Sequence, residues 1–314
     1  MDVVAVVAGE ALVDLTPGST ADGRDALVPV LGGAPLNVAV AAARLGAAVG
    51  WSGPVGSDAF AGLVGERLKA EGIDAGAVVQ VDAPTSLAVV HLDDEGRASY
   101  GFYLDGTSTR ATGAVVPELP DGAALVVCAG AIGFEDPPYG AALAEALRRE
   151  AGRRPVWLDP NVRPSAVDDP ARYLALLDGL VAGCDVVKVS DEDLAALVGG
   201  GAEDAMQVAR RWAGSGPAMV VATLGPDGLL ALRDDGREVR VDGVAVEVVD
   251  TVGAGDTVTG ALLAGLAARD ALGAAAVRAL PDDDVAAVLA AAAAAAAVTC
   301  TRRGADPPRA DELG

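Results

Sequence analysis

Short apolar runs alternate with longer segments in which apolar residues recur at helical spacing along most of this chain. The apolar runs predict β-strands at residues 3–8, 124–128, 156–158, 186–189 and 219–223. The segments with helical spacing predict α-helices at residues 35–45, 59–71, 139–150, 170–180 and 202–212. Strands that alternate with helices are typical of a parallel sheet with helices on both faces. The pattern therefore predicts an α/β fold built on a doubly wound, mostly parallel sheet flanked by helices.

Two regions depart from this alternation. Residues 12–30 contain a turn rich in glycine and aspartate, followed by a short apolar run at residues 26–30. Residues 85–104 alternate between apolar and polar on both sides of a turn at residues 93–96, which predicts a β-hairpin. We expect these two segments to form a small β element inserted into the α/β core.

The composition is that of a globular protein with an aliphatic core. Hydrophobic residues make up 52% of the 314 residues and aromatic residues only 3%, so alanine, valine and leucine must fill the interior. The net charge of −22 argues against nucleic acid and anionic membranes as partners, since both bind basic surfaces. The same charge would repel ATP, so a nucleotide site in this chain needs Mg²⁺ and a few well-placed cations.

Cysteine and histidine offer little chemistry here. Cys128, Cys184 and Cys300 are widely spaced and form no metal-binding motif, and two of them adjoin apolar runs and are interpreted as buried thiols. The only histidine, His91, lies in an alternating stretch and is interpreted as a residue on the surface of a strand. A zinc site or a histidine-based catalytic triad is therefore not expected.

No segment of the sequence predicts a membrane protein. Residues 1–7 are apolar but have no basic segment, which predicts a first buried strand and not a signal peptide. The alanine run at residues 291–297 closely follows three aspartates at residues 282–284 and predicts a buried or close-packed helix without a transmembrane span. Together with the unpatterned cysteines, these features favour a cytoplasmic location.

The string Asp-Thr-Val-Gly-Ala-Gly-Asp at residues 250–256 stands before a long apolar helical pattern at residues 258–268. The N-terminus of a helix has free N–H groups and a partial positive charge, which suit a phosphate group. Asp256 would lie in the first turn, where a carboxylate is suited to accept the proton of a hydroxyl group that attacks phosphorus. The alternative is a tight turn whose acidic residue complements the helix dipole, an effect of roughly 0.3–1 kcal/mol.

This seven-residue string resembles the C-terminal signature of the ribokinase-like, or PfkB, family of carbohydrate kinases. Family members often have phenylalanine two residues after the final aspartate, where this chain has Val258. The resemblance implies one ribokinase-like domain over residues 1–314, with a small β-sheet lid formed by residues 12–31 and 84–112. It also implies the catalytic base and the anion hole, which are Asp256 and the N–H groups of Gly253, Ala254 and Gly255.

A second string, Gly-Gly-Ala-Pro-Leu-Asn at residues 32–37, resembles the N-terminal signature of the same family, particularly of its fructokinases. Paired glycines let a ligand approach the backbone, and Asn37 offers a donor and an acceptor near a helix start. Asp14 follows the first strand, where an open α/β sheet has its ligand crevice. The residues alone leave open a glycine loop with a capping amide, and a solvated carboxylate. The resemblance implies that the sugar is bound by Asp14, Gly32, Gly33 and Asn37.

Two more strings, at residues 159–163 and 223–228, lie at the ends of predicted strands. Residues 159–163, Asp-Pro-Asn-Val-Arg, resemble an element of fructokinase-like members, in which Arg163 would contact the substrate and the transferred phosphoryl group. Asp159 and Asn161 are equally well explained as structural partners of their loop. Residues 223–228 resemble a family element that touches the nucleotide phosphates, and without the resemblance they predict only a hairpin turn.

Residues 188–193, Lys-Val-Ser-Asp-Glu-Asp, stand where the family usually has Asn-x-x-Glu. This chain has Ser190 and Asp193 at those two positions, and a helix N-cap with an acidic first turn is the alternative interpretation. Residues 291–299 and 304–305 resemble the region that borders the adenine. The implied nucleotide-binding residues are Lys188, Ser190, Thr223, Gly225 and Gly228, and the implied Mg²⁺ contact is Asp193 through a water molecule.

The predicted lid bears on the substrate. Members that act on 2-keto-3-deoxygluconate tend to have arginine beside a lid tyrosine, and this chain has Leu104 beside Tyr103. Tyr103 is therefore expected to contact a neutral sugar, with fructose as the first expectation. Ribose, another neutral sugar or a nucleoside is the alternative, as is a catalytically silent sugar-binding regulator. A dinucleotide-dependent dehydrogenase is disfavoured because residues 9–14 lack the pattern G-x-G-x-x-G.

The resemblance also implies the reaction and its other participants. An ATP-dependent kinase would transfer the γ-phosphoryl group to a primary hydroxyl group of the sugar, with Mg²⁺ on the ATP and with K⁺ as a candidate monovalent cation. Lid strands in this family can pair between subunits, so the resemblance is compatible with a homodimer formed through the lid.

Overall fold

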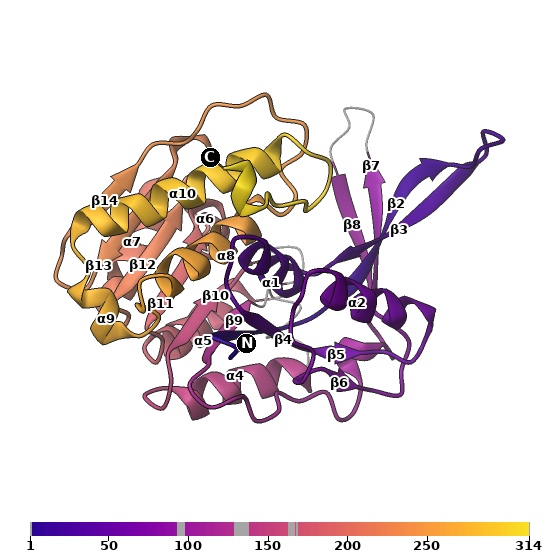
Figure 1. Ribbon diagram of the computed structural model, residues 1–314, viewed down its shortest axis with the longest axis horizontal. Coiled ribbons are helices and arrows are strands. Elements are labelled where there is room, and N and C mark those ends of the chain that lie inside the picture. Colours follow the sequence, from indigo (N-terminus) through magenta and orange to yellow (C-terminus); the bar gives the residue numbers. More distant parts are fainter. Residues whose placement is uncertain (1, 93–97, 129–137, 163–166, 168, 314) are drawn as a thin grey trace.

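The structure is a computed structural model, and it describes residues 2–92, 98–128, 138–162, 167 and 169–313 (Figure 1). Its centre is an eight-stranded sheet with the strand order β14-β13-β12-β11-β10-β9-β1-β4. The six strands from β12 to β4 in this order are parallel. At the other edge, β13 pairs antiparallel with β12, and β14 pairs antiparallel with β13. The strands are β1 (Ala5–Ala8), β4 (Val49–Ser52), β9 (Ala124–Cys128), β10 (Val156–Asp159), β11 (Val186–Ser190), β12 (Met219–Thr223), β13 (Leu229–Arg233) and β14 (Glu238–Val241).

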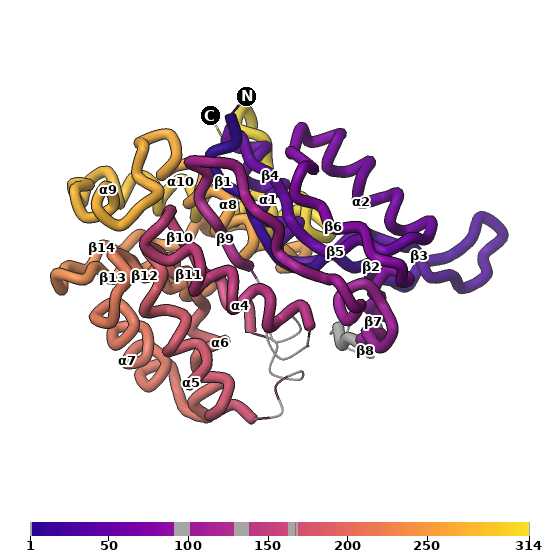
Figure 2. Tube along the Cα trace, turned by 90° about the horizontal axis from the view of Figure 1, so that it is seen from below, coloured from indigo at the N-terminus to yellow at the C-terminus, as the bar shows by residue number. Residues whose placement is uncertain are grey.

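Helices cover both faces of this sheet, as the alternating pattern predicted. One apolar cluster joins one face of the sheet to α1 (Ala34–Arg44), α2 (Ala59–Ala70), α8 (Ala254–Ala267), α9 (Ala274–Ala279) and α10 (Asp282–Cys300). A second cluster joins the other face to α4 (Tyr139–Glu150), α5 (Pro170–Val181), α6 (Asp191–Val198) and α7 (Ala202–Ala213). Figure 2 shows α4, α5 and α7 together on one side of the main sheet. The predicted doubly wound α/β class is confirmed.

A small four-stranded sheet extends from the core and carries both of the segments that depart from the alternation (Figure 1). Its order is β3-β2-β7-β8, in which β2 and β3 form one hairpin and β7 pairs with β8 in another. The strands are β2 (Leu12–Ser19), β3 (Asp25–Gly32), β7 (Leu87–Leu92) and β8 (Ala98–Tyr103). A separate two-stranded sheet pairs β5 (Pro54–Val55) with β6 (Val79–Gln80).

The periodicity missed several elements. It predicted neither β4, β13 nor β14, which are short, and it left α9 as a connection. The start of α6 agrees with the alternative interpretation of Ser190 as a helix N-cap. The hairpin turn predicted at residues 223–228 is present, as the 3-10 turn η3 (Gly225–Asp227) between β12 and β13. Cys128 and Cys184 are buried free thiols, as predicted, and Cys300 is partly exposed.

Helix α10 contains the alanine run. Within the described ranges it is the one helix that is long and apolar enough to cross a membrane by length and composition. Its first turn carries three aspartates, and its apolar residues belong to the cluster shared with α8 and the main sheet. This packing agrees with the predicted close-packed helix, since the core helix of a globular domain meets the same length and composition test.

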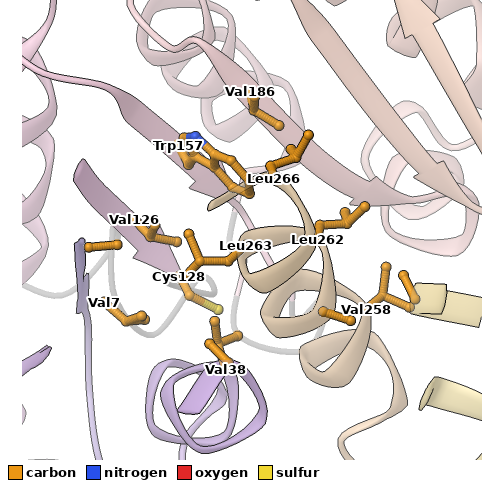
Figure 3. Close-up of a cluster of buried hydrophobic side chains, with 14 of the residues drawn as sticks. Val7, Val38, Val126, Cys128, Trp157, Val186, Val258, Leu262, Leu263 and Leu266 are labelled. Carbon is orange, nitrogen blue, oxygen red and sulfur yellow. The ribbon is translucent and has the colours of Figure 1, made fainter. Parts of the chain in front are cut away.

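Helices α1 and α8 pack unusually closely at Gly260. A Cβ atom at position 260 would lie 2.5 Å from the Cβ of Ala41 and 2.8 Å from the carbonyl oxygen of Val38. Around this contact, Val258, Leu262, Leu263 and Leu266 of α8 belong to the same buried apolar cluster as Val38 of α1 and Val126 of the sheet (Figure 3). The absence of a side chain at position 260 therefore lets α1 and α8 approach closely just beyond their first turns, which carry the polar pair described next.

Candidate active site

A cleft of about 900 Å³ lies along the carboxyl ends of the parallel strands, at the root of the small sheet. Open α/β sheets bind ligands at this edge. The cleft extends from Leu12 and Phe102 of the small sheet to the loop after β14 and to one side of α10. The predicted site residues that line it are Asp14, Gly33, Asn37, Lys188, Ser190, Asp193, Thr223, Gly225, Gly228, Gly253, Ala254, Gly255 and Asp256.

The N-terminus of α8 opens into the middle of this cleft. Gly253 is its N-cap residue, with a left-handed φ of 77°, and a Cβ atom there would lie 2.5 Å from the Cβ of Ala305. The first intrahelical bond runs from the N–H of Thr257 to the carbonyl of Gly253, so the N–H groups before it have no partner within the helix. The N–H of Ala254 donates to the carbonyl of Thr251 at 3.2 Å instead. The turn is thus shaped as an anion site, with one of its three predicted donors already bonded within the loop.

Asp256 lies in the first turn of α8 and is 8% exposed. The side-chain amide of Asn37 donates a hydrogen bond of 2.9 Å to its carboxylate oxygen Oδ2. Asn37 comes from the first turn of α1, which begins after Gly33 and contains Pro35 in its first turn. Residues that are 219 positions apart in sequence therefore meet in one polar pair, and both line the cleft.

The glycine pair before α1 serves two different contacts. A Cβ atom at Gly32 would lie 2.3 Å from the Asp14 carboxylate, so position 32 leaves room for that carboxylate. Gly33 has a left-handed φ of 107°, and a Cβ atom there would lie 2.7 Å from the carbonyl of Glu10. Asp14 and Gly33 line the cleft, whereas Gly32 lies behind Asp14 and is not among the lining residues. The packing of Asp14 is therefore sufficient to explain Gly32.

Lys188 is the one cationic side chain among the described residues that line the cleft. It is 6% exposed, and its ammonium group lies 3.3 Å from the Asp159 carboxylate. Burial alone would lower the pKa of Lys188, but the charges of Asp159, Asp193 and Asp256 raise the pKa above its ordinary value of 10.5. Lys188 is therefore a permanent positive charge beside the N-terminus of α8.

Ser190 and the acidic residues after it begin α6. The hydroxyl oxygen of Ser190 accepts a hydrogen bond of 3.0 Å from the N–H of Asp193, which is a helix N-cap. Asp191, Glu192 and Asp193 occupy the first turn and line the cleft. No group of three or more histidine, cysteine, aspartate or glutamate side chains within the described ranges could hold a metal ion by itself. These carboxylates suit a hydrated Mg²⁺ that a nucleotide brings with it.

The far end of the cleft combines a glycine turn with an apolar surface. Gly225 and Gly228 have left-handed φ angles of 54° and 90°, so both positions need glycine. The neighbouring apolar lining residues are Val244, Ala245, Val246, Val248, Ala293, Ala296 and Ala297. Sequence reasoning placed the helix part of this surface near the adenine but missed residues 244–248. The recurrence of valine at every second position, 244, 246 and 248, was the available signal.

Of the remaining predictions, one concerns a described residue that does not line the cleft, and two concern residues whose side chains the structure does not describe. Tyr103 is 61% exposed, and its neighbour Phe102 on β8 lines the cleft instead. The alternation of side chains along a strand turns these two residues to opposite faces. Arg163 lies outside the described residues. His91 belongs to β7, as expected, but its side chain is outside the described part.

Comparisons with known proteins agree with this arrangement. A family model described as pfkB family carbohydrate kinase matches residues 5–312. The fructokinase of Rhizobium leguminosarum bv. trifolii is 38% identical over 259 residues, which are 82% of this chain and 78% of that protein. The crystal structure of the Xylella fastidiosa fructokinase with bound ATP has a TM-score of 0.84 at 27% identity, covering 98% of this chain and 96% of that one. The Vibrio cholerae fructokinase bound to fructose, ADP and calcium ion has a TM-score of 0.81 at 28% identity, covering 99% and 98%.

Proposed function

Because this chain belongs to the pfkB family of carbohydrate kinases and is an ATP-dependent sugar kinase, we propose that it phosphorylates fructose at a primary hydroxyl group. The similarity to fructokinases supports the choice of sugar. The observation that supports the proposed chemistry is the hydrogen bond of 2.9 Å that the Asn37 side-chain amide donates to the Asp256 carboxylate. It orients a carboxylate in the cleft at the N-terminus of α8, where a sugar hydroxyl and a phosphate group can meet.

Asp256 is proposed as the general base. It accepts the proton of the attacking hydroxyl as the bond from that oxygen to the γ-phosphorus forms. Asp14, Gly33 and Asn37 are proposed to bind the other sugar hydroxyl groups, since all three line the cleft at the root of the small sheet. Gly32 would act indirectly, by making room for Asp14. Tyr103 and Arg163 remain predictions from the resemblance, and an exposed Tyr103 could reach the sugar only if the small sheet moved.

The turn Gly253-Ala254-Gly255 is proposed to bind the transferred phosphoryl group through its N–H groups and the dipole of α8. Lys188 adds a positive charge to the same place. Ser190, Thr223, Gly225 and Gly228 are proposed to contact the other phosphates, and the apolar end of the cleft is proposed to hold the adenine. Phosphoryl transfer depends chiefly on positioning and charge stabilisation, and this arrangement supplies both.

Mg²⁺ is the proposed metal ion. The described lining residues include six carboxylates, so the β- and γ-phosphates need a cation between them and the protein. Asp193 is proposed to contact this ion through water, because Mg²⁺ keeps much of its hydration shell. K⁺ is proposed as an accessory monovalent cation on the family resemblance alone.

The small sheet is proposed to act as a lid and as the contact between two subunits. Leu27, Val28 and Val30 of its edge strand β3 are exposed in the single chain. An edge strand with apolar side chains is prone to pair with another chain. We propose a cytoplasmic homodimer that covers this strand, and sedimentation analysis of wild type and Val28→Lys tests it.

The decisive experiment measures ADP release from MgATP with a panel of fructose, ribose, other neutral sugars, acidic and phosphorylated sugars, and nucleosides. Strong stimulation by fructose alone is the expected result. Greater stimulation by another panel member would keep the kinase and replace the sugar. Nucleotide hydrolysis that no member stimulates, in a folded protein that binds ATP, would overturn the catalytic proposal and favour a sugar-binding regulator.

A further inference from the structure

A buried ion pair lies directly beneath the N-terminal turn of α8. The Lys188 ammonium group is 3.3 Å from Oδ2 and 3.5 Å from Oδ1 of Asp159, which is 1% exposed. Oδ2 also accepts a hydrogen bond of 2.5 Å from the hydroxyl of Thr259, a buried residue of α8. Deeper in the same layer the contacts are apolar, between Trp157, Val186 and Leu266 (Figure 3). A buried ion pair is weak evidence for stability, because apolar residues of similar volume often stabilise a protein as well.

The strand register explains why these three side chains meet. Trp157 and Val186 are direct neighbours in the pairing of β10 with β11, and both face α8. Side chains two residues farther along a strand face the same way, so Asp159 and Lys188 also face α8, at the carboxyl edge of the sheet. Thr259 lies one turn beyond Asp256 on α8. The polar trio therefore lies at the level where the apolar layer ends and the cleft begins.

The ammonium group points at the proposed phosphoryl site. A Cβ atom at Gly255 would lie 3.1 Å from Nζ of Lys188, so this amine lies against the backbone of the first turn of α8. Lysine has a long, flexible side chain that a single charge does not orient. The Asp159 carboxylate fixes the far end of this side chain, and the Thr259 hydroxyl in turn fixes the carboxylate.

We propose that Asp159 and Thr259 are positioning residues for phosphoryl transfer, which hold the Lys188 ammonium group against the first turn of α8. This inference rests on the proposed phosphate site. Lys188 would stabilise the charge on the transferred phosphoryl group, and Asp159 and Thr259 would act only through Lys188. Asp159 also accepts a hydrogen bond of 3.2 Å from the N–H of Asn161, so it is a structural partner of its loop as well as a partner of Lys188.

A double-mutant cycle with Asp159→Asn and Lys188→Met tests the proposal. Each variant is assayed for kcat and for the KM of MgATP and of the sugar that most stimulates the wild type. We expect Asp159→Asn to lower kcat about 10–100-fold, the range found for residues that orient a metal ligand. The double variant should have a kcat within about twofold of Lys188→Met alone, because the effect of Asp159 runs through Lys188. The KM of the sugar should not change in any of the three variants.

Thr259 provides an independent arm with matched controls. Thr259→Val removes the hydroxyl without changing the shape of the side chain and should lower kcat about tenfold, the lower end of the range expected for Asp159→Asn. Thr259→Ser keeps the hydroxyl and should have a kcat close to that of wild type. Thr109→Val is the control, because Thr109 is equally buried and its hydroxyl shares a hydrogen bond with the hydroxyl of Ser86, outside the cleft lining. It should lower the unfolding temperature comparably and leave kcat unchanged.

Two results would overturn the proposal. One is a double variant in which the two losses of kcat multiply, since independent effects behave in that way. The other is Thr259→Val with a wild-type kcat. The double variant removes both charges of the pair, so its comparison with Lys188→Met remains available even if Asp159→Asn does not fold. A wild type that prefers a sugar other than fructose overturns only the sugar assignment, because the cycle measured with that sugar still decides the role of Asp159.

Discussion

Replacement of Gly260 by alanine should force α1 and α8 apart at the point where they support the cleft. The new Cβ would lie 2.5 Å from the Cβ of Ala41 and 2.8 Å from backbone atoms of α1, whereas ordinary contact begins at 3.4 Å. The difference means that the two helices must separate by about 0.9 Å. Both neighbours belong to a regular helix, so no flexible side chain can move aside. Overpacking of a dense core typically destabilises by about 1–3 kcal/mol.

The same displacement should reach the active site. Asn37 and Asp256 lie in the first turns of the two helices that pack together at Gly260, and a hydrogen bond of 2.9 Å links their side chains. A displacement near 1 Å at a catalytic group can lower the rate about 10²-fold. We therefore expect Gly260→Ala to lower both the free energy of unfolding and kcat. The assays are denaturation by urea, followed by circular dichroism, and sugar-dependent ADP release.

The matched controls are Gly62→Ala and Gly65→Ala. These glycines lie inside α2, and a Cβ atom at either position would meet nothing within 4 Å. Alanine is favoured over glycine inside a helix by roughly 0.5–1 kcal/mol, so these variants should be as stable as wild type or more so. If Gly260→Ala behaved like them, with unchanged stability and kcat, the argument from close helix packing would be refuted.

Two further predictions concern carboxylates. Asp256→Asn should fold normally and lower kcat about 10²–10⁴-fold, the usual contribution of a general base. The control is Asp284→Asn, which removes an acidic residue from the first turn of a different helix, α10, outside the cleft, and should leave kcat unchanged. Near-wild-type turnover of Asp256→Asn would refute the role of Asp256. Burial tends to raise the pKa of Glu71, but the hydrogen bonds and charge of Arg44, with further charges nearby, lower it below 4.5. The ionised Glu71 carboxylate should therefore stabilise the fold fully above pH 4.5, and this stabilisation should disappear as the pH falls through the lowered pKa. Measured by urea denaturation, Glu71→Gln should be less stable than wild type near neutral pH, and the difference should shrink in acid. An equal loss at every pH would contradict the second prediction.

The sequence was most informative where one local signal decided a position. The alternation of strands and helices placed the polar strings at the carboxyl ends of parallel strands, and those ends meet at one edge. This geometry suffices to bring Lys188, Ser190 and Thr223 to the same cleft. The glycine-rich turn before α8 was likewise predictable, because left-handed backbone and a helix start both leave signals in the sequence.

What the sequence did not reveal depends on contacts between distant segments. Gly260 looks like an ordinary helical residue, and only the position of Ala41 explains it. The pair of Asp159 with Lys188 needs the register of β10 and β11, which no periodicity determines. Tyr103 and Phe102 are both aromatic neighbours on a short strand, so the face that each presents depends on how the small sheet is oriented. These are tertiary relations, and a single sequence carries no signal for them.

The charge of the cleft explains how so acidic a chain can bind a nucleotide. The described lining residues carry six carboxylates and one ammonium group, so the site by itself repels a free triphosphate. One of only two lysines in the chain is placed at this position, buried against the turn that is proposed to bind the phosphates. A buried charge is screened less than a surface charge, and it acts together with the dipole of α8 over a few ångströms. The attraction is thus confined to the place of transfer, while the remaining carboxylates favour the nucleotide only when a divalent cation accompanies it.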